Sequence, residues 1–162
     1  MQEEKTNVMR FLEQKKVVYR PHWYACPDGA VDGISVAALL GKDAETVFKT
    51  LVTQGASKKY YVFVIPAQRE LDLKAAAKAA GEKSIQMLRQ AELLPLTGYV
   101  HGGCSPLGMK KQLTTFLDAS AQGLASVTVS AGRIGAQVEL DPEVLCRLVR
   151  GRFAAVSKEP AL

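Results

Sequence analysis

The sequence lacks the motifs that mark the common enzyme and membrane classes. It has no GxxxxGK[ST] phosphate loop and no GxGxxG motif, so the usual signatures of nucleotide cofactors are missing. It has no GxSxG motif, which removes the commonest serine-hydrolase pattern. No apolar run is long enough to cross a bilayer, and the N-terminal residues lack the apolar region of a signal peptide. We therefore expect a cytosolic protein.

Cysteine and histidine are scarce as well. The three cysteines, Cys26, Cys104 and Cys146, have no CxxC spacing, and their odd number argues against a disulfide framework. The two histidines, His22 and His101, lack the partner spacing of metal ligands. The sequence therefore predicts no metal site and no cofactor.

The charge is moderately basic. A formal net charge of +5 and an isoelectric point near 9.2 permit an anionic partner such as nucleic acid. The excess is spread along the chain, and a solubilised surface accounts for most of the lysines. Charge alone does not decide between these explanations.

The order of the predicted elements indicates one α+β domain with a central mixed or antiparallel β-sheet. Thr6 is a suitable N-cap, Gly41 and Gly81 are suitable helix ends, and Pro142 suits a first helical turn. Pro21 in the extended segment argues for an edge strand or a break. The patterns predict helices at 6–16, 34–41, 71–81 and 142–150, strands at 46–54, 59–66, 126–130 and 136–140, an extended segment at 17–24, a loop at 25–33, and a short strand and helix within 83–94.

The stretch VFKTLV, residues 47–52, carries a lysine inside an otherwise strand-like segment. Because side chains alternate along a strand, Lys49 shares a face with Val47 and Leu51. A buried ammonium group is costly to desolvate, so such a lysine either meets an anion in a cleft or reaches solvent along its stem. Both explanations remain open from the pattern alone.

The stretch HGGCSPLG, residues 101–108, is the most glycine-rich part of the chain. Adjacent glycines let a backbone approach a ligand, and their N–H groups can bind an oxyanion; a plain loop is the alternative. Cys104 near His101 resembles a nucleophile and base, but residues three apart in a loop need not meet. We expect an inert thiol rather than a nucleophile.

A third candidate is SAGRIG, residues 130–135, between two predicted strands. Ser130 offers a hydroxyl, Gly132 a backbone N–H, and Arg133 a forked cation that suits phosphate. A hairpin with an exposed arginine is the alternative. Each of the three candidates is weak when taken singly.

Taken together, the segments resemble a known family. TNVMRFLEQ, VFKTLV, LDLKAAAKAAG, LTGYVHGGCSPLGMKK and VTVSAGRIGAQVEL occur in the order found in the YbaK family, which is related to the editing domain of bacterial prolyl-tRNA synthetases. The similarity runs from about residue 5 to about residue 153. It implies one YbaK-like domain over residues 1–162, with a C-terminal tail at about 154–162.

The resemblance implies a trans-editing deacylase that hydrolyses mischarged Cys-tRNA(Pro), without metal or protein nucleophile, through attack by the substrate's own thiol. The implied partners are the 3′ end of tRNA(Pro) and prolyl-tRNA synthetase. Lys49 matches the family's key lysine, and its amine and the amides of Gly102 and Gly103 are expected to stabilise the reacting oxygen in one shared hollow. The matching pocket residues are Tyr24, Thr50, Gly102, Gly103, Ser130, Gly132 and Arg133.

Some positions depart from the family pattern. Asp32 replaces an aromatic residue of some relatives, Gln137 replaces an acid, and Ile134 replaces a second basic residue. These changes bear on which amino acid is removed, so an Ala-tRNA(Pro) deacylase is an alternative. A non-catalytic module that binds tRNA or a synthetase is another. Lys110, Lys111 and Arg133 are expected to border the cleft and to meet phosphates.

Overall fold

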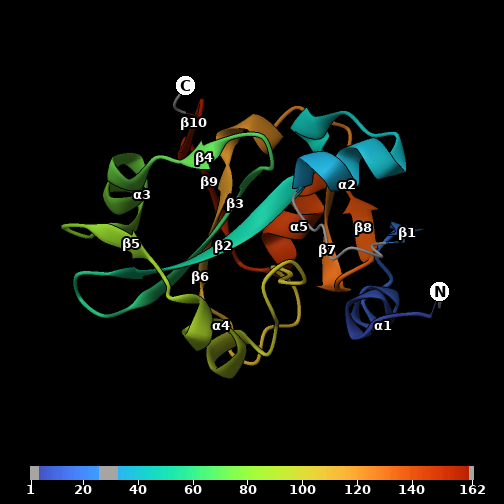
Figure 1. Cartoon of the computed structure of the whole chain (residues 1–162), viewed down its shortest axis with the longest axis horizontal. Helices are drawn as coiled ribbons and strands as arrows, with labels where there is room; N and C mark the ends of the chain where they lie inside the picture. The colour runs from blue at the N-terminus through green and yellow to red at the C-terminus, as the bar shows by residue number, and fades with distance from the viewer. Residues whose placement is uncertain (1–3, 26–32, 161–162) are drawn as a thin grey trace.

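Two larger β-sheets lie side by side in the computed structural model, which describes residues 4–25 and 33–160 (Figure 1). The five-stranded sheet has the order β5-β2-β3-β6-β9, with β6 parallel to β3 and β9 and the other pairs antiparallel. The predicted mixed sheet is therefore confirmed. Its strands are β2 (Phe48–Gly55), β3 (Tyr60–Pro66), β5 (Ile85–Met87), β6 (Thr114–Asp118) and β9 (Arg152–Ala154).

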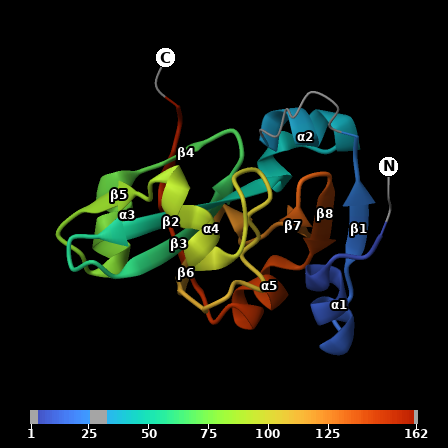
Figure 2. The ribbon, with the colours of Figure 1, turned by 60° about the horizontal axis from the view of Figure 1, so that its bottom comes forward.

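The second sheet is antiparallel, with the order β1-β8-β7 (Figure 2). It contains β1 (Arg20–Trp23), β7 (Val127–Arg133) and β8 (Ala136–Leu140), and β1 is the edge strand that Pro21 predicts. An isolated parallel bridge between Val47 and Thr128 joins this sheet to the start of β2. The two short strands β4 (Glu70–Leu71) and β10 (Ser157–Lys158) pair separately.

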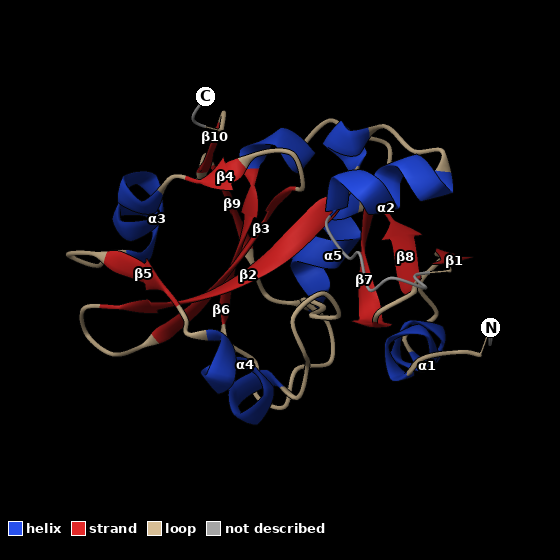
Figure 3. Cartoon of the chain, viewed as in Figure 1, coloured by secondary structure: helices blue, strands red, loops and turns tan. Residues whose placement is uncertain are grey.

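Helices cover the sheets (Figure 3). Thr6 caps α1 by accepting a hydrogen bond from the amide of Met9, and Gly81 ends α3 with a φ of 71°, as the sequence predicts. No helix within the described ranges is long and apolar enough to cross a membrane. The elements are α1 (Asn7–Gln14), α2 (Gly33–Leu40), α3 (Leu73–Ala80), α4 (Gln90–Thr97), α5 (Pro142–Leu148) and the 3₁₀ helices η1 (Ala44–Thr46) and η2 (Ala119–Ala121).

The two faces of the β2–β3 hairpin pack into different parts of the core. Phe48 and Val52 belong to the larger cluster, which also contains Cys104 and residues of α1, α5, β7 and β8. Leu51 packs against the smaller cluster, in which the rings of Phe63 and Phe116 stack 5.4 Å apart. Neighbouring side chains of β2 therefore meet different surroundings.

The sequence patterns miss β4, β6, β9 and β10, and Leu71, which the patterns predict to be helical, lies in β4. β6 pairs with residues that lie about 50 positions earlier and 40 positions later, so no local signal marks it. Val156 of the predicted tail is fully buried, and the amides of Val156 and Ser157 each donate to Oδ1 of Asp118 at 3.0 Å. Residues 154–158 are thus part of the fold.

Glu139 on β8 accepts hydrogen bonds from three side chains around the three-stranded sheet. Its Oε1 accepts from Nε2 of His22 at 2.9 Å and from Nζ of Lys42 at 2.6 Å, and its Oε2 accepts from Oγ of Ser126. Although burial acts in the opposite direction, the hydrogen bonds from Lys42, Ser126 and His22 lower the pKa of Glu139 to about 2. The charged carboxylate is therefore favoured by the fold.

Replacing Glu139 should lower stability in a pH-dependent way. A carboxyl group whose pKa falls from 4.5 to about 2 on folding contributes about 3 kcal/mol above pH 4.5 and loses this contribution as the pH falls toward 2. We expect Glu139→Gln to lower the free energy of unfolding at pH 7 by about 2–3 kcal/mol. Urea unfolding between pH 2.5 and 7 should show a shallower acid decline than in the parent, whereas the exposed Glu45→Gln should keep the parent's decline. Equal declines in Glu139→Gln and parent would contradict this role.

Candidate functional site

Thr50 and Lys49 lie on opposite faces of β2. Thr50 shares its face with Phe48 and Val52 and so points toward the cluster that contains Cys104 and Ala131. Its Oγ1 is buried and has no hydrogen-bond partner among the described residues. A buried hydroxyl without a partner costs free energy, so this atom is available to a ligand.

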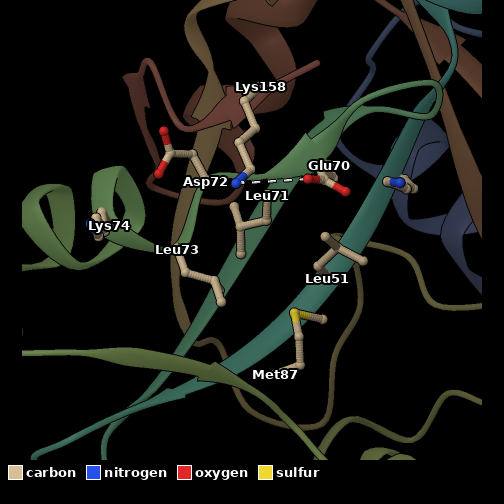
Figure 4. Close-up of a pocket in the computed structure, with 9 residues that line it drawn as sticks. Leu51, Glu70, Leu71, Asp72, Leu73, Lys74, Met87 and Lys158 are labelled. Carbon is tan, nitrogen blue, oxygen red and sulfur yellow. Dashed lines mark ion pairs between the residues drawn. The ribbon is translucent and has the colours of Figure 1, made fainter. Parts of the chain in front are cut away.

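Lys49 lines a cavity of about 690 Å³ on the other face. The ammonium group is half-buried, and this desolvation lowers the pKa of Lys49, while the charge of Glu70 acts in the opposite direction. Lys158 lies beside Glu70 in the lining of this cavity, with 3.7 Å between Nζ and Oε1 (Figure 4). The remaining lining residues are Leu51, Leu71, Asp72, Leu73, Lys74 and Met87.

The paired-glycine loop lies directly against the turn that follows Ser130. A Cβ atom on Gly103 would stand 3.2 Å from the backbone nitrogen of Ile134 and 3.5 Å from Cα of Arg133, so only glycine allows this approach without a shift. The N–H of Gly103 donates to the carbonyl of Val100 at 3.0 Å. Because that amide is already hydrogen-bonded, the N–H of Gly102 is the remaining candidate in this loop for the expected stabilisation of an oxyanion.

The turn itself is held by an internal hydrogen bond. Ser130 is buried, and its Oγ accepts from the N–H of Gly132 at 3.1 Å, which leaves the hydroxyl proton of Ser130 available for donation. A bulge separates Ser130 from Arg133, and Gly132 has a φ of +93°. Arg133 is exposed, and its Nη2 donates to the carbonyl of Glu4 at 3.5 Å.

Tyr24, the residue after β1, joins the same assembly. Its N–H donates to the carbonyl of Gly135 at 3.0 Å, and its side chain is buried. Its phenol oxygen, like Oγ1 of Thr50, has no partner in the described part of the chain. The structure thus brings Tyr24, the turn at 130–135 and the loop around Gly103 together.

The described cavities do not place Lys49 with these segments. Gly132 and Arg133 line a second cavity, of about 490 Å³, which shares no lining residue with the Lys49 cavity. The shared hollow that the family resemblance implies therefore stays a prediction. The expected loop at 25–33, with Cys26 and Asp32, lies largely outside the described residues.

The thiol of Cys104 is poorly suited to act as a nucleophile. Burial raises its pKa to about 12, so the thiol stays protonated at neutral pH. His101 is exposed, and His22 is engaged by Glu139. Within residues 4–25 and 33–160, no three His, Cys, Asp or Glu side chains are placed to hold a metal ion.

The sequence patterns did not single out Trp23. Its indole Nε1 is a third buried polar atom without a partner among the residues described. Trp23 and Tyr24 adjoin in one strand-like segment, so their pattern alone gives no sign of which polar atoms stay unpaired.

Comparison with known proteins defines the family. The family model described as "Aminoacyl-tRNA editing domain" matches residues 30–148. The chain belongs to this family, which confirms the resemblance seen in the motifs.

Individual relatives agree with this assignment. An Enterococcus faecalis protein named "Putative Cys-tRNA(Pro)/Cys-tRNA(Cys) deacylase EbsC" is 46% identical over 155 residues, covering 96% of this chain and 94% of that protein. A proline–tRNA ligase of Pelobacter propionicus is 27% identical over 96 residues, which are 59% of this chain and 17% of the ligase. The fold matches a crystal structure of a "putative trans-editing enzyme for prolyl tRNA synthetase", with a TM-score of 0.80, 22% identity, and coverage of 96% of this chain and 99% of that one.

Removing the unpaired hydroxyl of Thr50 should not weaken the free protein. Thr50→Val loses no hydrogen bond to residues 4–25 or 33–160, so we expect the free energy of unfolding to stay unchanged or to rise by up to about 1 kcal/mol. The matched control is Thr53→Val on the same strand, where Oγ1 of Thr53 donates to the carbonyl of Tyr61 at 3.0 Å. That control should lose about 1 kcal/mol in urea unfolding. A loss in Thr50→Val as large as in the control would mean that the hydroxyl has a partner after all.

Proposed function

We propose that this chain is a trans-editing deacylase that hydrolyses the ester between cysteine and the terminal adenosine of mischarged tRNA(Pro). Its membership of the aminoacyl-tRNA editing family supports this activity, as does the name of the Enterococcus relative, which the chain matches along almost its whole length. Cysteine and proline are similar in size, so one binding pocket cannot separate them firmly. A second, hydrolytic site is the usual solution.

One observation carries the proposal within the structure: Tyr24 and Thr50, which the family resemblance assigns to the pocket, have buried hydroxyls without a partner among the described residues. An unsatisfied buried polar group costs about 1–3 kcal/mol, and a bound ligand with complementary groups removes this cost. The amino and carbonyl groups of an aminoacyl ester supply such partners. Ser130 adds a hydroxyl that can donate, beside a loop whose glycines admit a close approach.

The chemistry needs no nucleophile from the protein. The cysteinyl thiol of the substrate attacks its own ester carbonyl, forming a carbon–sulfur bond as the carbon–oxygen bond to the ribose breaks. The thiol proton goes to the departing ribose oxygen, and water then opens the thioester product to free cysteine. The protein contributes orientation and stabilisation of the charged carbonyl oxygen, for which the amide of Gly102 is the candidate in the loop. The protonated state of Cys104 supports this division of roles.

Lys49 is assigned to electrostatic stabilisation of the reacting ester. A desolvated ammonium interacts more strongly with a developing negative charge than an exposed one does, and Lys49 is half-buried. Lys49 lies on the face of β2 opposite Thr50, so substitution of Lys49 alone tests this assignment.

We expect Lys49→Ala to slow deacylation roughly a hundred- to a thousandfold, the usual loss for one such charge-stabilising donor. The measurement is single-turnover release of labelled cysteine from Cys-tRNA(Pro). The control is Lys74→Ala, which removes an exposed ammonium from the same cavity and should retain the parent's rate. A Lys49→Ala protein as fast as this control would remove Lys49 from the catalytic site while leaving the deacylase activity in place.

The substrate is tested by a panel of acylated tRNAs. We expect release of cysteine from Cys-tRNA(Pro) to exceed release of alanine from Ala-tRNA(Pro), because only cysteine carries the attacking thiol. The parent and Cys104→Ala should act alike. Faster hydrolysis of Ala-tRNA(Pro) would favour the alanine-specific alternative, with water as nucleophile. No acceleration on any acylated tRNA, despite binding, would favour a non-catalytic module.

Recognition of the tRNA body is assigned to a complex with prolyl-tRNA synthetase. The similarity to part of a proline–tRNA ligase supports a relation to that enzyme. Repeating the panel with the synthetase present tests it: added synthetase should increase the preference for tRNA(Pro) over other tRNAs that carry cysteine.

A further inference from the structure

A second cavity opens beside the turn at 130–135, between α1, β7 and the segment that follows α4. Its volume is about 490 Å³, ample for a phosphate group. Figure 1 shows α1 beside the end of β7. The lining residues are Thr6, Asn7, Val8, Arg10, Thr97, Gly98, Tyr99, Gly108, Lys110, Ala131, Gly132 and Arg133.

The charged side chains of this lining are all cations. Arg10, Lys110 and Arg133 come from three different segments, and no carboxylate belongs to the described lining. Across residues 4–25 and 33–160, the ammonium of Lys110 has no ion pair. Glu13, farther along α1, is paired with Lys5 at 2.9 Å. The cavity therefore favours an anion.

Arg10 and Lys110 are exposed, and each has a local contact that restricts its side chain. Nη1 of Arg10 donates to Oδ1 of Asn7 at 3.1 Å, which leaves further N–H groups of the guanidinium for a ligand. A Cβ on Gly98 would stand 3.2 Å from Cγ of Lys110, so the lysine stem packs across the end of α4. A preorganised cation loses less entropy when it binds phosphate.

The cavity adjoins the proposed acyl site. Gly132 and Arg133 line the cavity and belong to the turn against which Gly103 packs. A tRNA whose terminal ester lies at Gly102, Gly103 and Ser130 would have its preceding phosphates near this turn. The same turn thus separates the ester from the charged cavity.

We propose that this cavity binds a backbone phosphate of the single-stranded 3′ end of the tRNA, through Arg10 and Lys110. The inference rests on the proposed function, because that function places the 3′ end at the turn. The sequence pattern expects both Lys110 and Lys111 to meet phosphates; both side chains are exposed, and the proposal selects Lys110 because it lines the cavity and Lys111 does not.

The test measures binding of uncharged tRNA(Pro) by the full chain at several salt concentrations. The double variant Arg10→Ala/Lys110→Ala should bind roughly tenfold more weakly. Its slope of log affinity against log salt should be shallower by about 0.7 for one lost phosphate contact. Lys111→Ala is the matched control and should bind nearly as the parent does, and Arg10→Lys/Lys110→Arg should restore most of the affinity.

A second RNA, the same tRNA without its single-stranded 3′ end, locates the contact. The parent and the double variant should bind this RNA equally. A double variant with the parent's affinity and salt slope on intact tRNA would overturn the proposal, and so would an equal loss on both RNAs. Because uncharged tRNA is not hydrolysed, a protein that binds in this way but releases no amino acid would refute the deacylase proposal and leave the phosphate site standing.

Discussion

The bridge between Val47 and Thr128 is the contact on which the arrangement of the candidate site depends. It fixes the start of β2 beside β7, and hence the position of the turn that follows Ser130 relative to β2. The alternation of β2 then divides its polar side chains between two environments. Thr50 faces the larger core cluster, and Lys49 faces the cavity that Glu70 and Lys158 also line.

Close backbone approach is the second constraint. At Gly103 the obstacle to a larger residue is the backbone of Arg133 and Ile134, which cannot move without displacing the turn. At Gly132 a Cβ would stand 2.9 Å from the ring of Tyr99, and the positive φ also disfavours other residues. The glycine-rich motifs therefore have a structural reason that holds whether or not a ligand is bound.

Much of the fold follows from local sequence signals. The caps at Thr6 and Gly81 and the alternation of β7 and β8 predict their elements, whereas β6 and β9 depend on pairing with distant residues that no local pattern reveals. The family resemblance implies that the glycine loop and the 130–135 turn line one pocket, and in the structure Gly103 packs directly against Arg133 and Ile134 of that turn. The alternation of side chains along a strand predicts which face of β2 carries Lys49. It does not predict the cavity that this face lines. The sequence predicts Lys110 at the border of the cleft, whereas Arg10 gives no signal, because only the fold brings α1 beside the segment of Lys110 and the 130–135 turn.

The pairing of β10 with β4 has a consequence for biosynthesis. Lys158 pairs with Glu70 on the adjacent strand and lines the cavity of Lys49, so one wall of this cavity includes a residue that is translated long after residues 49–87. Val156 must also reach its buried position before that wall is complete. A nascent chain can therefore assemble the hairpin and α3 early, yet the surroundings of Lys49 mature only after residue 158 has left the ribosome.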